Sequence, residues 1–262
     1  MPSNQPALSR FLNRLLSRSA LGDEEQQAIL GLTSHAVQVR PNYDIVTPGD
    51  TVDHACLVAH GLAARYDHMT DGKRQLTAFY IDGDMCDLHS VVCPTAAWGI
   101  VALTTTTVLK VPHSELRALV DSYPAIALAF WRDGTVDASI LAKWIGNVGR
   151  RDARARMAHV FCELGLRMEA AGLGNRDAYW FDVSQQNLSD ALGLTAVHVN
   201  RTLQILRSNG FMRTESRNIF IDDWARLCDV AEFDAAYLLL PCSGHERENT
   251  SAQQSRAGTT VR

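Results

Sequence analysis

The chain of 262 residues has a formal net charge of −4, with 46% hydrophobic and 21% charged residues. This balance is typical of a globular protein with room for two domains, and it excludes a disordered or fibrous chain. It also excludes a uniformly basic coat for nucleic acid, although the segment from Thr195 to Asn218 holds four arginines and one glutamate.

The sequence contains no obvious membrane, targeting or metal signal. No apolar run reaches the roughly 18 to 20 residues that span a bilayer, and the first residues lack the pattern of a signal peptide. The six cysteines are scattered without a C-x-x-C pair, which indicates reduced thiols. We therefore expect a cytoplasmic protein with no membrane partner, no metal and no cofactor.

The N-terminal half is expected to combine short helices with a β-domain. Apolar residues at helical spacing predict helices within residues 7–32, the second starting at Asp23. From 36 to 111, β-branched stretches alternate with regularly spaced glycines, Asp71-Gly72 predicts a tight hairpin turn, and 100–111 resembles one further strand. Many short strands with few helices between them favour an antiparallel barrel or jelly roll.

A helical region follows Pro112. A short helix from Ser114 precedes a longer helix over 124–148, which carries two apolar stripes. One stripe consists of Trp131, Thr135, Ala138, Ala142 and Ile145, and the other of Phe130, Val136, Ile140 and Trp144. Two apolar faces predict two partners, the barrel and a second copy of the helix, or else a single monomer core.

The rest of the chain divides at a predicted hinge, Gly149 to Asp152. Asp152 can cap a helix that runs to about Ala171, and residues 172–177 are expected to form a loop. The stretch from Pro241 onward is polar and is expected to be disordered.

The segment SQQNLSDALGLTAVHVNRTLQILR, residues 184–207, predicts two helices around one glycine turn. Ser184 and Thr195 can cap the two helices, and Gly193 permits the turn between them. Apolar residues give each helix a buried face. The outward face of the second helix is expected to comprise Ala196, Val197, Asn200, Arg201 and Gln204. Such a pair can present its second helix to a DNA major groove, although a helical pair that only packs shares part of this pattern.

Residues 210–221 favour the DNA-binding reading, because they predict two short strands around a polar, basic turn, and they contain Arg213 and Arg217. A basic hairpin beside a helix pair is suited to contacts with DNA phosphates.

These features together resemble the CRP/FNR superfamily of transcription regulators over about residues 10–235. The resemblance is strongest in LSDALGLT (188–195), VNRTL (199–203) and the hairpin entry at Gly210, with weaker matches at Gly83-Asp84, Gly146-Asn147, Asp152 and Arg156. It implies an α+β protein with a double-stranded β-helix sensor barrel resembling a cyclic-nucleotide-binding domain, a dimerisation helix and a winged helix-turn-helix. The corresponding ranges are 1–123, 124–149 and 150–240, with a tail at 241–262.

The resemblance also implies a homodimer on a palindromic double-stranded DNA site, with RNA polymerase as a candidate partner. Arg201 matches the family's guanine-contacting arginine, whereas Val197 stands where many members have a base-reading glutamate. The DNA-binding residues are expected to include Ser184, Gln185, Thr195, Ala196, Val197, Asn200, Arg201, Gln204, Arg213 and Arg217.

The sensor departs from the members of the family that bind cyclic AMP. Leu88 occupies the position of the ribose-binding glutamate, no arginine-serine pair follows near Trp98, and Leu141-Ala142 occupy the purine-recognition positions. A cyclic phosphate would therefore lack its countercharge. An unidentified small-molecule effector is expected instead, with Asp87, Leu88, His89 and Ser90 as the candidate lining, although strand-end hydrogen bonding is the more ordinary role for Asp87, His89 and Ser90.

Four other readings compete with an effector-gated regulator. The absence of closely spaced N-terminal cysteines argues against an iron-sulfur cluster. Haem needs only one axial ligand, for which His89, His60 and Cys56 are candidates. A cupin-like metal enzyme would need converging His and carboxylate ligands that the sequence does not supply, so we expect no enzyme. An interaction module without selective DNA binding is the remaining alternative.

Overall fold

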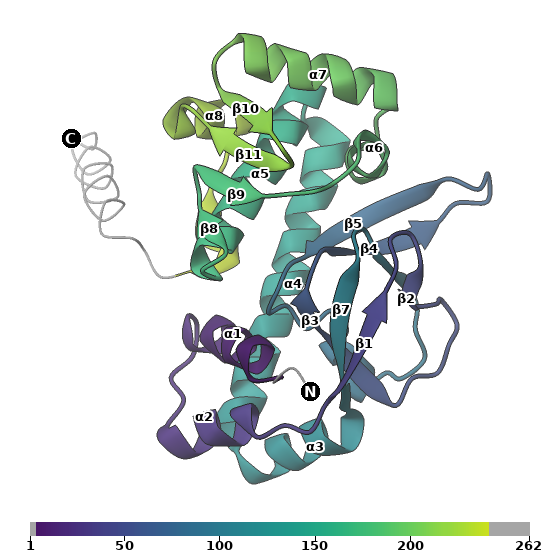
Figure 1. Ribbon diagram of the computed structural model, residues 1–262, viewed down its shortest axis with the longest axis vertical. Coiled ribbons are helices and arrows are strands. Elements are labelled where there is room, and N and C mark those ends of the chain that lie inside the picture. The colour runs from purple at the N-terminus through teal and green to yellow at the C-terminus, as the bar shows by residue number, and fades with distance from the viewer. Residues whose placement is uncertain (1–3, 241–262) are drawn as a thin grey trace, which may run out of the picture.

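The structure is a computed structural model that describes residues 4–240. A β-barrel and a C-terminal domain lie one below the other in Figure 1, and a long helix runs past both. Two N-terminal helices, α1 (Gln5–Leu16) and α2 (Asp23–Leu30), confirm the predicted helical region. The apolar face of α1 packs on the barrel, where Phe11 shares a buried cluster with Leu57 and Leu109.

The barrel is built from antiparallel strands in two sheets. One sheet has the order β1-β7-β3 and the other β2-β6-β4-β5. The strands are β1 (His35–Val39), β2 (Asp44–Val46), β3 (His54–His60), β4 (Ala63–His68), β5 (Arg74–Tyr80), β6 (Gly99–Ala102) and β7 (Thr106–Pro112). A short 3-10 helix, η1 (Leu88–Val91), interrupts the strands between β5 and β6. The jelly-roll prediction is confirmed.

Two details of the barrel correct the sequence analysis. Residues 100–111 were predicted as one strand but belong to two strands in different sheets. Where the chain crosses between the sheets, threonine hydroxyls replace the backbone hydrogen bonds of a strand. Thr104 Oγ1 accepts from Leu62 N at 2.9 Å, and Thr106 Oγ1 donates to Leu62 O at 2.9 Å. The β4–β5 connection spans residues 69–73, and only its Gly72 has a positive φ, of 81°. Asp71 stabilises this wider turn by accepting hydrogen bonds from the backbone and side-chain nitrogens of Lys73 at 3.0 and 2.7 Å.

The long helix α4 (Pro124–Arg150) follows α3 (His113–Ser122) and has two different faces. The stripe of Phe130, Val136, Ile140 and Trp144 is buried within the chain. The other stripe is exposed, with Trp131 at 75% and Ile145 at 68% of their full accessible surface. The predicted interruption is narrower than expected, because α4 includes Gly149 and Arg150 and only Arg151 and Asp152 separate it from α5 (Ala153–Ala170).

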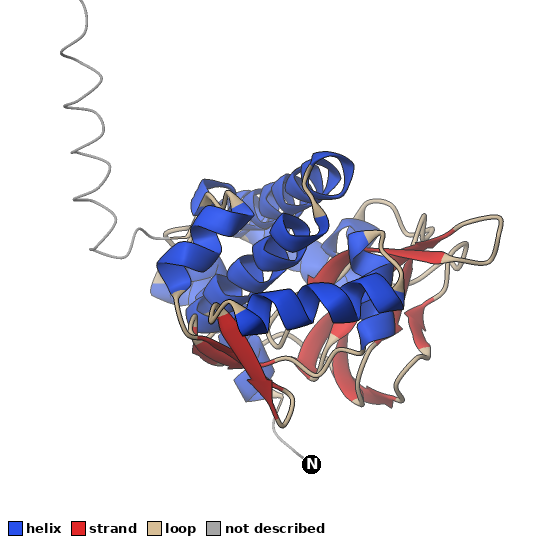
Figure 2. Ribbon diagram, turned by 90° about the horizontal axis from the view of Figure 1, so that it is seen from above, coloured by secondary structure: helices blue, strands red, loops and turns tan. Residues whose placement is uncertain are grey.

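The C-terminal domain combines α5 with a small sheet of order β10-β11-β9-β8 and a helix pair. Figure 2 shows its helices from above, with the barrel strands to one side. Its remaining elements are β8 (Gly174–Asn175), β9 (Ala178–Trp180), α6 (Gln185–Leu192), α7 (Ala196–Ser208), β10 (Met212–Glu215), β11 (Asn218–Ile221), α8 (Trp224–Ala231) and η2 (Ala235–Leu238). The prediction of a loop at 172–177 is wrong in part, because Gly174 and Asn175 form a short strand that pairs with β9. Glycine allows the two strands to come this close, since a Cβ added at Gly174 would lie 2.7 Å from Ala178 O. The predicted disordered tail lies outside the described residues.

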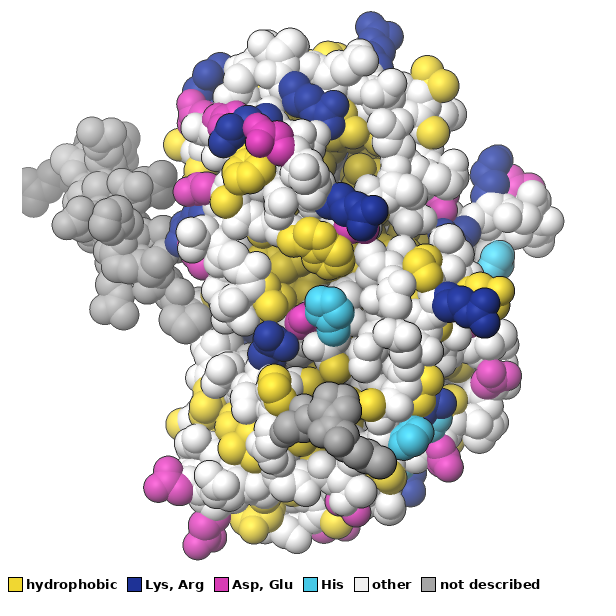
Figure 3. All heavy atoms as spheres, in the orientation of Figure 1, with side chains coloured by type: hydrophobic (Ala, Val, Ile, Leu, Met, Phe, Trp, Pro, Cys, Tyr) yellow, Lys and Arg dark blue, Asp and Glu magenta, His cyan; other side chains and the backbone are white. Residues whose placement is uncertain are grey.

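One apolar cluster joins the barrel to the C-terminal domain. At its centre the Phe79 ring of β5 meets the rings of Trp144 and Phe181 edge-on, at 5.5 and 5.4 Å between centroids. Beside it the surface is hollowed into a cleft of about 420 Å³ whose lining includes Leu62, Met168 and Trp180, in the region of Figure 3 where hydrophobic side chains gather between the two parts. None of the helices in residues 4–240 is both long and apolar enough to cross a membrane.

Candidate nucleic-acid interface

Helix α6 begins and ends as the sequence predicts. The Ser184 hydroxyl accepts a hydrogen bond from Asn187 N at 3.1 Å, which satisfies a backbone donor that the helix itself cannot. Gly193 ends the helix in the left-handed region, with φ of 63°. Its turn packs on the end of α4, because a Cβ added at Gly193 would lie 3.3 Å from Val148 Cγ1. The turn between α6 and α7 is thereby held against the long helix.

Helix α7 has the buried and exposed faces of a recognition helix. Thr195 Oγ1 accepts from His198 N at 3.2 Å and caps the helix. Its buried residues are Val199, Thr202, Leu203 and Leu206. The predicted outward residues Val197, Asn200, Arg201 and Gln204 are all exposed, and Ala196 is half-buried. Because these positions are three or four residues apart, they share one face of the helix.

Arg201 and Val197 are both exposed on this face. Val197 exposes 81% of its surface, which is unusual for an apolar residue. No described acidic residue lies within ion-pair distance of Arg201, so its planar fork of donors is not committed to another side chain of residues 4–240. The arrangement can offer an apolar contact and a bidentate donor to the edges of base pairs.

Strands β10 and β11 form the predicted hairpin beside α7. The turn residues Ser216 and Arg217 both have positive φ, of 46° and 71°, as a two-residue primed turn requires. Arg217 exposes its side chain but pairs with Asp182 at 3.0 Å. Arg213 stacks on Phe220 at 4.6 Å and lies 3.4 Å from Asp222. Both arginines are therefore partly paired with carboxylates, which the sequence did not reveal, and their remaining exposed N–H donors can reach a phosphate.

Arg207 is a further basic residue of this surface that the sequence analysis did not select. It is exposed near the end of α7 and donates a hydrogen bond to Thr214 Oγ1 of β10. It therefore joins α7 to the hairpin. The sequence feature that could have identified Arg207 is its position among the four arginines between residues 195 and 218.

The four residues predicted to line an effector pocket do not converge on one cavity. Leu88 and His89 line a groove of about 640 Å³ on the outside, between η1, α3 and α4. Ser90 is buried and its hydroxyl lies 2.8 Å from His113 Nε2. Asp87 is also buried, and its Oδ1 accepts from Cys56 N at 2.6 Å.

Asp87 belongs to an incompletely paired polar cluster inside the barrel. Burial raises the pKa of Asp87 to about 7, while its hydrogen bond with Cys56 N opposes the rise. Neither Asp87 Oδ2 nor the buried Tyr80 hydroxyl has a hydrogen-bond partner among the described residues. Nearby, Arg65 is buried under the Trp98 ring at 5.2 Å and donates to Thr77 Oγ1 at 2.9 Å. Arg65 was not among the residues predicted from the sequence; it is a cation on a strand that otherwise supplies small and aromatic residues to the interior.

Metal ligands do not gather in the part of the chain that the structure describes, since residues 4–240 contain no group of three His, Cys, Asp or Glu side chains that could hold an ion. The three residues named as candidate haem ligands differ in how accessible their side chains are. His60 exposes 76% of its side chain, Cys56 is fully buried, and His89 packs against Trp98 with 4.8 Å between ring centroids.

Comparisons with known proteins agree with this architecture. Residues 36–123 match the model of a cyclic nucleotide-binding domain, and residues 155–230 match that of a Crp-like helix-turn-helix domain. The chain is 28% identical over 204 residues to the "Probable transcriptional regulator flp" of Lacticaseibacillus casei, covering 77% of this chain and 89% of that protein. It is 23% identical over 217 residues to the "Transcriptional activator protein FnrL" of Cereibacter sphaeroides, covering 81% and 87%.

Solved structures share the fold. FixK2 from Bradyrhizobium japonicum superposes with a TM-score of 0.69 at 24% identity, covering 78% of this chain and all of that one. A CooA mutant from Carboxydothermus hydrogenoformans has a TM-score of 0.60 at 19% identity, covering 76% and 88%. With a cyclic-nucleotide-binding-like barrel, a long helix and a Crp-like helix-turn-helix in one chain, the protein belongs to the CRP/FNR superfamily of DNA-binding transcription regulators.

Proposed function

We propose that the chain regulates transcription as a cytoplasmic homodimer that places two α7 helices in successive major grooves of a palindromic DNA site. The observation that carries this proposal is the exposed face of α7, where Arg201 is unpaired within residues 4–240 and Val197 is exposed beside it. An arginine matches guanine O6 and N7, and an apolar side chain suits a thymine methyl group. In a dimer the two helices read half-sites about 34 Å apart.

The dimer interface is the exposed stripe of α4. Leu128, Trp131 and Ile145 expose 59%, 75% and 68% of their surfaces, and the small residues Ala138 and Ala142 lie between them on the same stripe. An apolar stripe of this length on a monomer is more than scattered surface hydrophobicity, and packing against a second copy removes it from water. The groove of about 640 Å³ continues this surface toward η1 and shares Trp131 with it.

The barrel, residues 1–123, acts as the sensor, α4 as the dimer helix, and residues 150–240 as the DNA-binding domain. The effector is a small molecule other than cyclic AMP. Support comes from Leu88, which lies toward the outer groove and offers no hydrogen bond to a ribose. RNA polymerase is the expected protein partner at promoters.

The experiment that tests this function is selection of bound sequences from random DNA with the full-length protein, with and without a cell extract as an effector source. The expected product is one palindrome whose half-sites contain a guanine, bound by two protein chains per duplex. Recovery of unrelated sequences at equal affinity, with or without extract, would refute selective DNA binding and favour an interaction module.

A further inference from the structure

The barrel contacts the C-terminal domain through two polar sites, one on each side of the shared apolar cluster. The first site is centred on Asp84, in the turn after β5. The second is the β4–β5 hairpin, which reaches α6 (Figure 1). Neither site belongs to the DNA-contacting surface.

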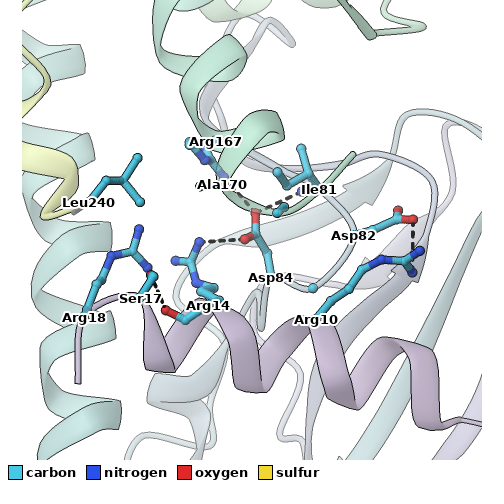
Figure 4. A pocket seen from close by; sticks show the side chains of 12 residues that line it. Arg10, Arg14, Ser17, Arg18, Ile81, Asp82, Asp84, Arg167, Ala170 and Leu240 are labelled. Atoms are coloured by element: carbon cyan, nitrogen blue, oxygen red, sulfur yellow. Dashed lines mark hydrogen bonds and ion pairs between the residues drawn. The ribbon is translucent and has the colours of Figure 1, made fainter. Parts of the chain in front are cut away.

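At the first site, Asp84 bridges two arginines from distant parts of the chain (Figure 4). Its Oδ1 accepts from Arg14 of α1 at 2.6 Å, and its Oδ2 accepts from Arg167 of α5 at 2.7 Å. Arg167 also donates to Phe79 O of β5 at 2.8 Å and to Glu163 at 3.2 Å. Because Asp84, Arg167 and Glu163 are all buried, separating α5 from the barrel would leave charges without partners.

Helix α1 extends this site to the long helix and to the end of the C-terminal domain. Arg14 also donates to Asp133 of α4 at 2.8 Å and lies 3.3 Å from Asp137. Arg18 donates to Leu238 O at 3.0 Å. The barrel, α1, α4 and α5 therefore meet in one buried network of charges.

At the second site, β5 holds the first helix of the helix-turn-helix. Arg74 donates to Asn187 at 3.2 Å and to Asp190 at 3.3 Å, and Gln75 donates to Ala191 O at 3.2 Å. These groups are more accessible than those at the first site, with side-chain exposures of 21% for Arg74 and 14% for Asp190. Since α6 carries α7 through the turn at Gly193, this contact fixes the direction of the recognition helix.

The two contacts lie on the C-terminal domain that follows the short link between α4 and α5, and they act together with the apolar cluster between them. Only Arg151 and Asp152 separate α4 from α5, so rotation there changes the angle between the dimer helix and α7. Any such rotation must break the Asp84 bridge, the Arg74 contact, or both. A single joint restrained on two sides has one preferred angle.

We propose that these contacts set the spacing between half-sites that the dimer accepts, and that Asp84, Arg167, Arg74 and Asp190 are positioning residues for DNA recognition. This inference rests on the proposed dimer that binds a palindrome. With the contacts intact, the two α7 helices are held at one separation. With either contact broken, the C-terminal domains move about the joint and fit half-sites at several separations, while each α7 still reads the same bases.

The test measures binding of full-length protein to palindromes that differ only in the number of base pairs between half-sites. Inserting or deleting one base pair rotates one half-site by about 36° relative to the other. For the unaltered protein we expect each such change to weaken binding about 10-fold or more, comparable to a mismatched base pair. For Arg74→Asp, which repels Asp190, we expect a loss of less than about threefold per step. The charge exchange Arg74→Asp with Asp190→Arg should restore the steep dependence.

Lys73→Asp is the matched control, because it makes the same charge change on the same hairpin but removes only the exposed pair with Asp71. It should keep the dependence of the unaltered protein. Asp84→Asn, checked by thermal unfolding, should act in the same direction as Arg74→Asp. Base preference within a half-site should be the same for all variants.

Two results would overturn the positioning role while leaving the proposed function standing. One is a spacing dependence of Arg74→Asp as steep as that of the unaltered protein. The other is equal flattening by Lys73→Asp, which would assign the effect to charge. Loss of base selectivity in the unaltered protein would instead overturn the proposed function, and this inference with it.

Discussion

Replacing Asp87 by asparagine should raise the stability of the protein, and the gain should depend on pH. Burial raises the pKa of Asp87 from 3.8 to about 7. In the folded protein the Asp87 carboxyl therefore keeps its proton up to about pH 7, whereas in the unfolded chain it loses the proton near pH 4. Between these two pH values the folded state binds more protons than the unfolded state. The free energy of unfolding therefore falls as the pH rises from about 4 to about 7. The fall is at most about 4 kcal/mol, at 1.36 kcal/mol for each unit of pKa.

Asparagine removes this dependence while keeping the local hydrogen bond. Its side-chain oxygen can accept from Cys56 N as Asp87 Oδ1 does at 2.6 Å. At pH 5 the buried aspartate is neutral, but the unfolded one is already ionised, so part of the fall has already occurred there. Between pH 5 and pH 8 the stability of the asparagine variant relative to the unaltered protein should grow by about 2.6 kcal/mol.

The assay is urea unfolding of both proteins at a series of pH values from 5 to 8. Other acids with raised pKa values, such as the half-buried Asp137 at about 6, affect both proteins alike and cancel in the difference. Asp71→Asn is the control. The Asp71 carboxyl is exposed and Lys73 lowers its pKa, so Asp71 changes its protonation only at more acidic pH and its replacement should give a constant difference in the free energy of unfolding from pH 5 to 8. A difference between unaltered protein and Asp87→Asn that stays constant from pH 5 to 8 would refute the assignment of a raised pKa to Asp87.

Three further outcomes are expected. A glutamate at Ala138 or Ile145 should convert the dimer into monomers in sedimentation, and an unchanged dimer would remove the exposed stripe of α4 from the interface. Gly193→Ala should lower the free energy of unfolding by about 1 kcal/mol or more, since alanine is strained at φ of 63° and its Cβ would lie 3.3 Å from Val148 Cγ1. Unchanged urea unfolding would contradict the requirement for glycine at the turn between α6 and α7. Calorimetry should detect no binding of cyclic AMP at micromolar concentrations, and a saturable heat would refute the proposed effector class.

The helix-turn-helix could be predicted from the sequence because its chemistry is local. A cap needs one hydroxyl three residues before the donor it satisfies, and Ser184 and Thr195 provide this as predicted. Gly193 has the backbone conformation that its place between two helices required. The buried stripe of α4 was likewise visible, since helical spacing alone defines it.

The partners of charged residues could not be predicted, because they come from distant parts of the chain. Asp84 and Arg167 are 83 residues apart, and the sequence marked Asp84 only as a weak family match. The pairing of Arg217 with Asp182 depends on how the hairpin folds back beside the start of α6. The predicted effector residues 87–90 were adjacent in sequence, but a change from turn to 3-10 helix at η1 directs them to different surroundings.

The most direct test of selective DNA recognition compares Arg201→Ala with Arg217→Ala, on a selected site and its single-base variants, across a range of salt concentrations. Arg201→Ala should cost about 1 to 3 kcal/mol and abolish the preference for guanine at one position of each half-site. Arg217→Ala should weaken binding to all sequences alike and make the salt dependence shallower, as loss of a phosphate contact does. If Arg201→Ala keeps the base preference and changes only affinity and salt dependence, as Arg217→Ala does, then Arg201 does not read a base and the proposed recognition surface is wrong.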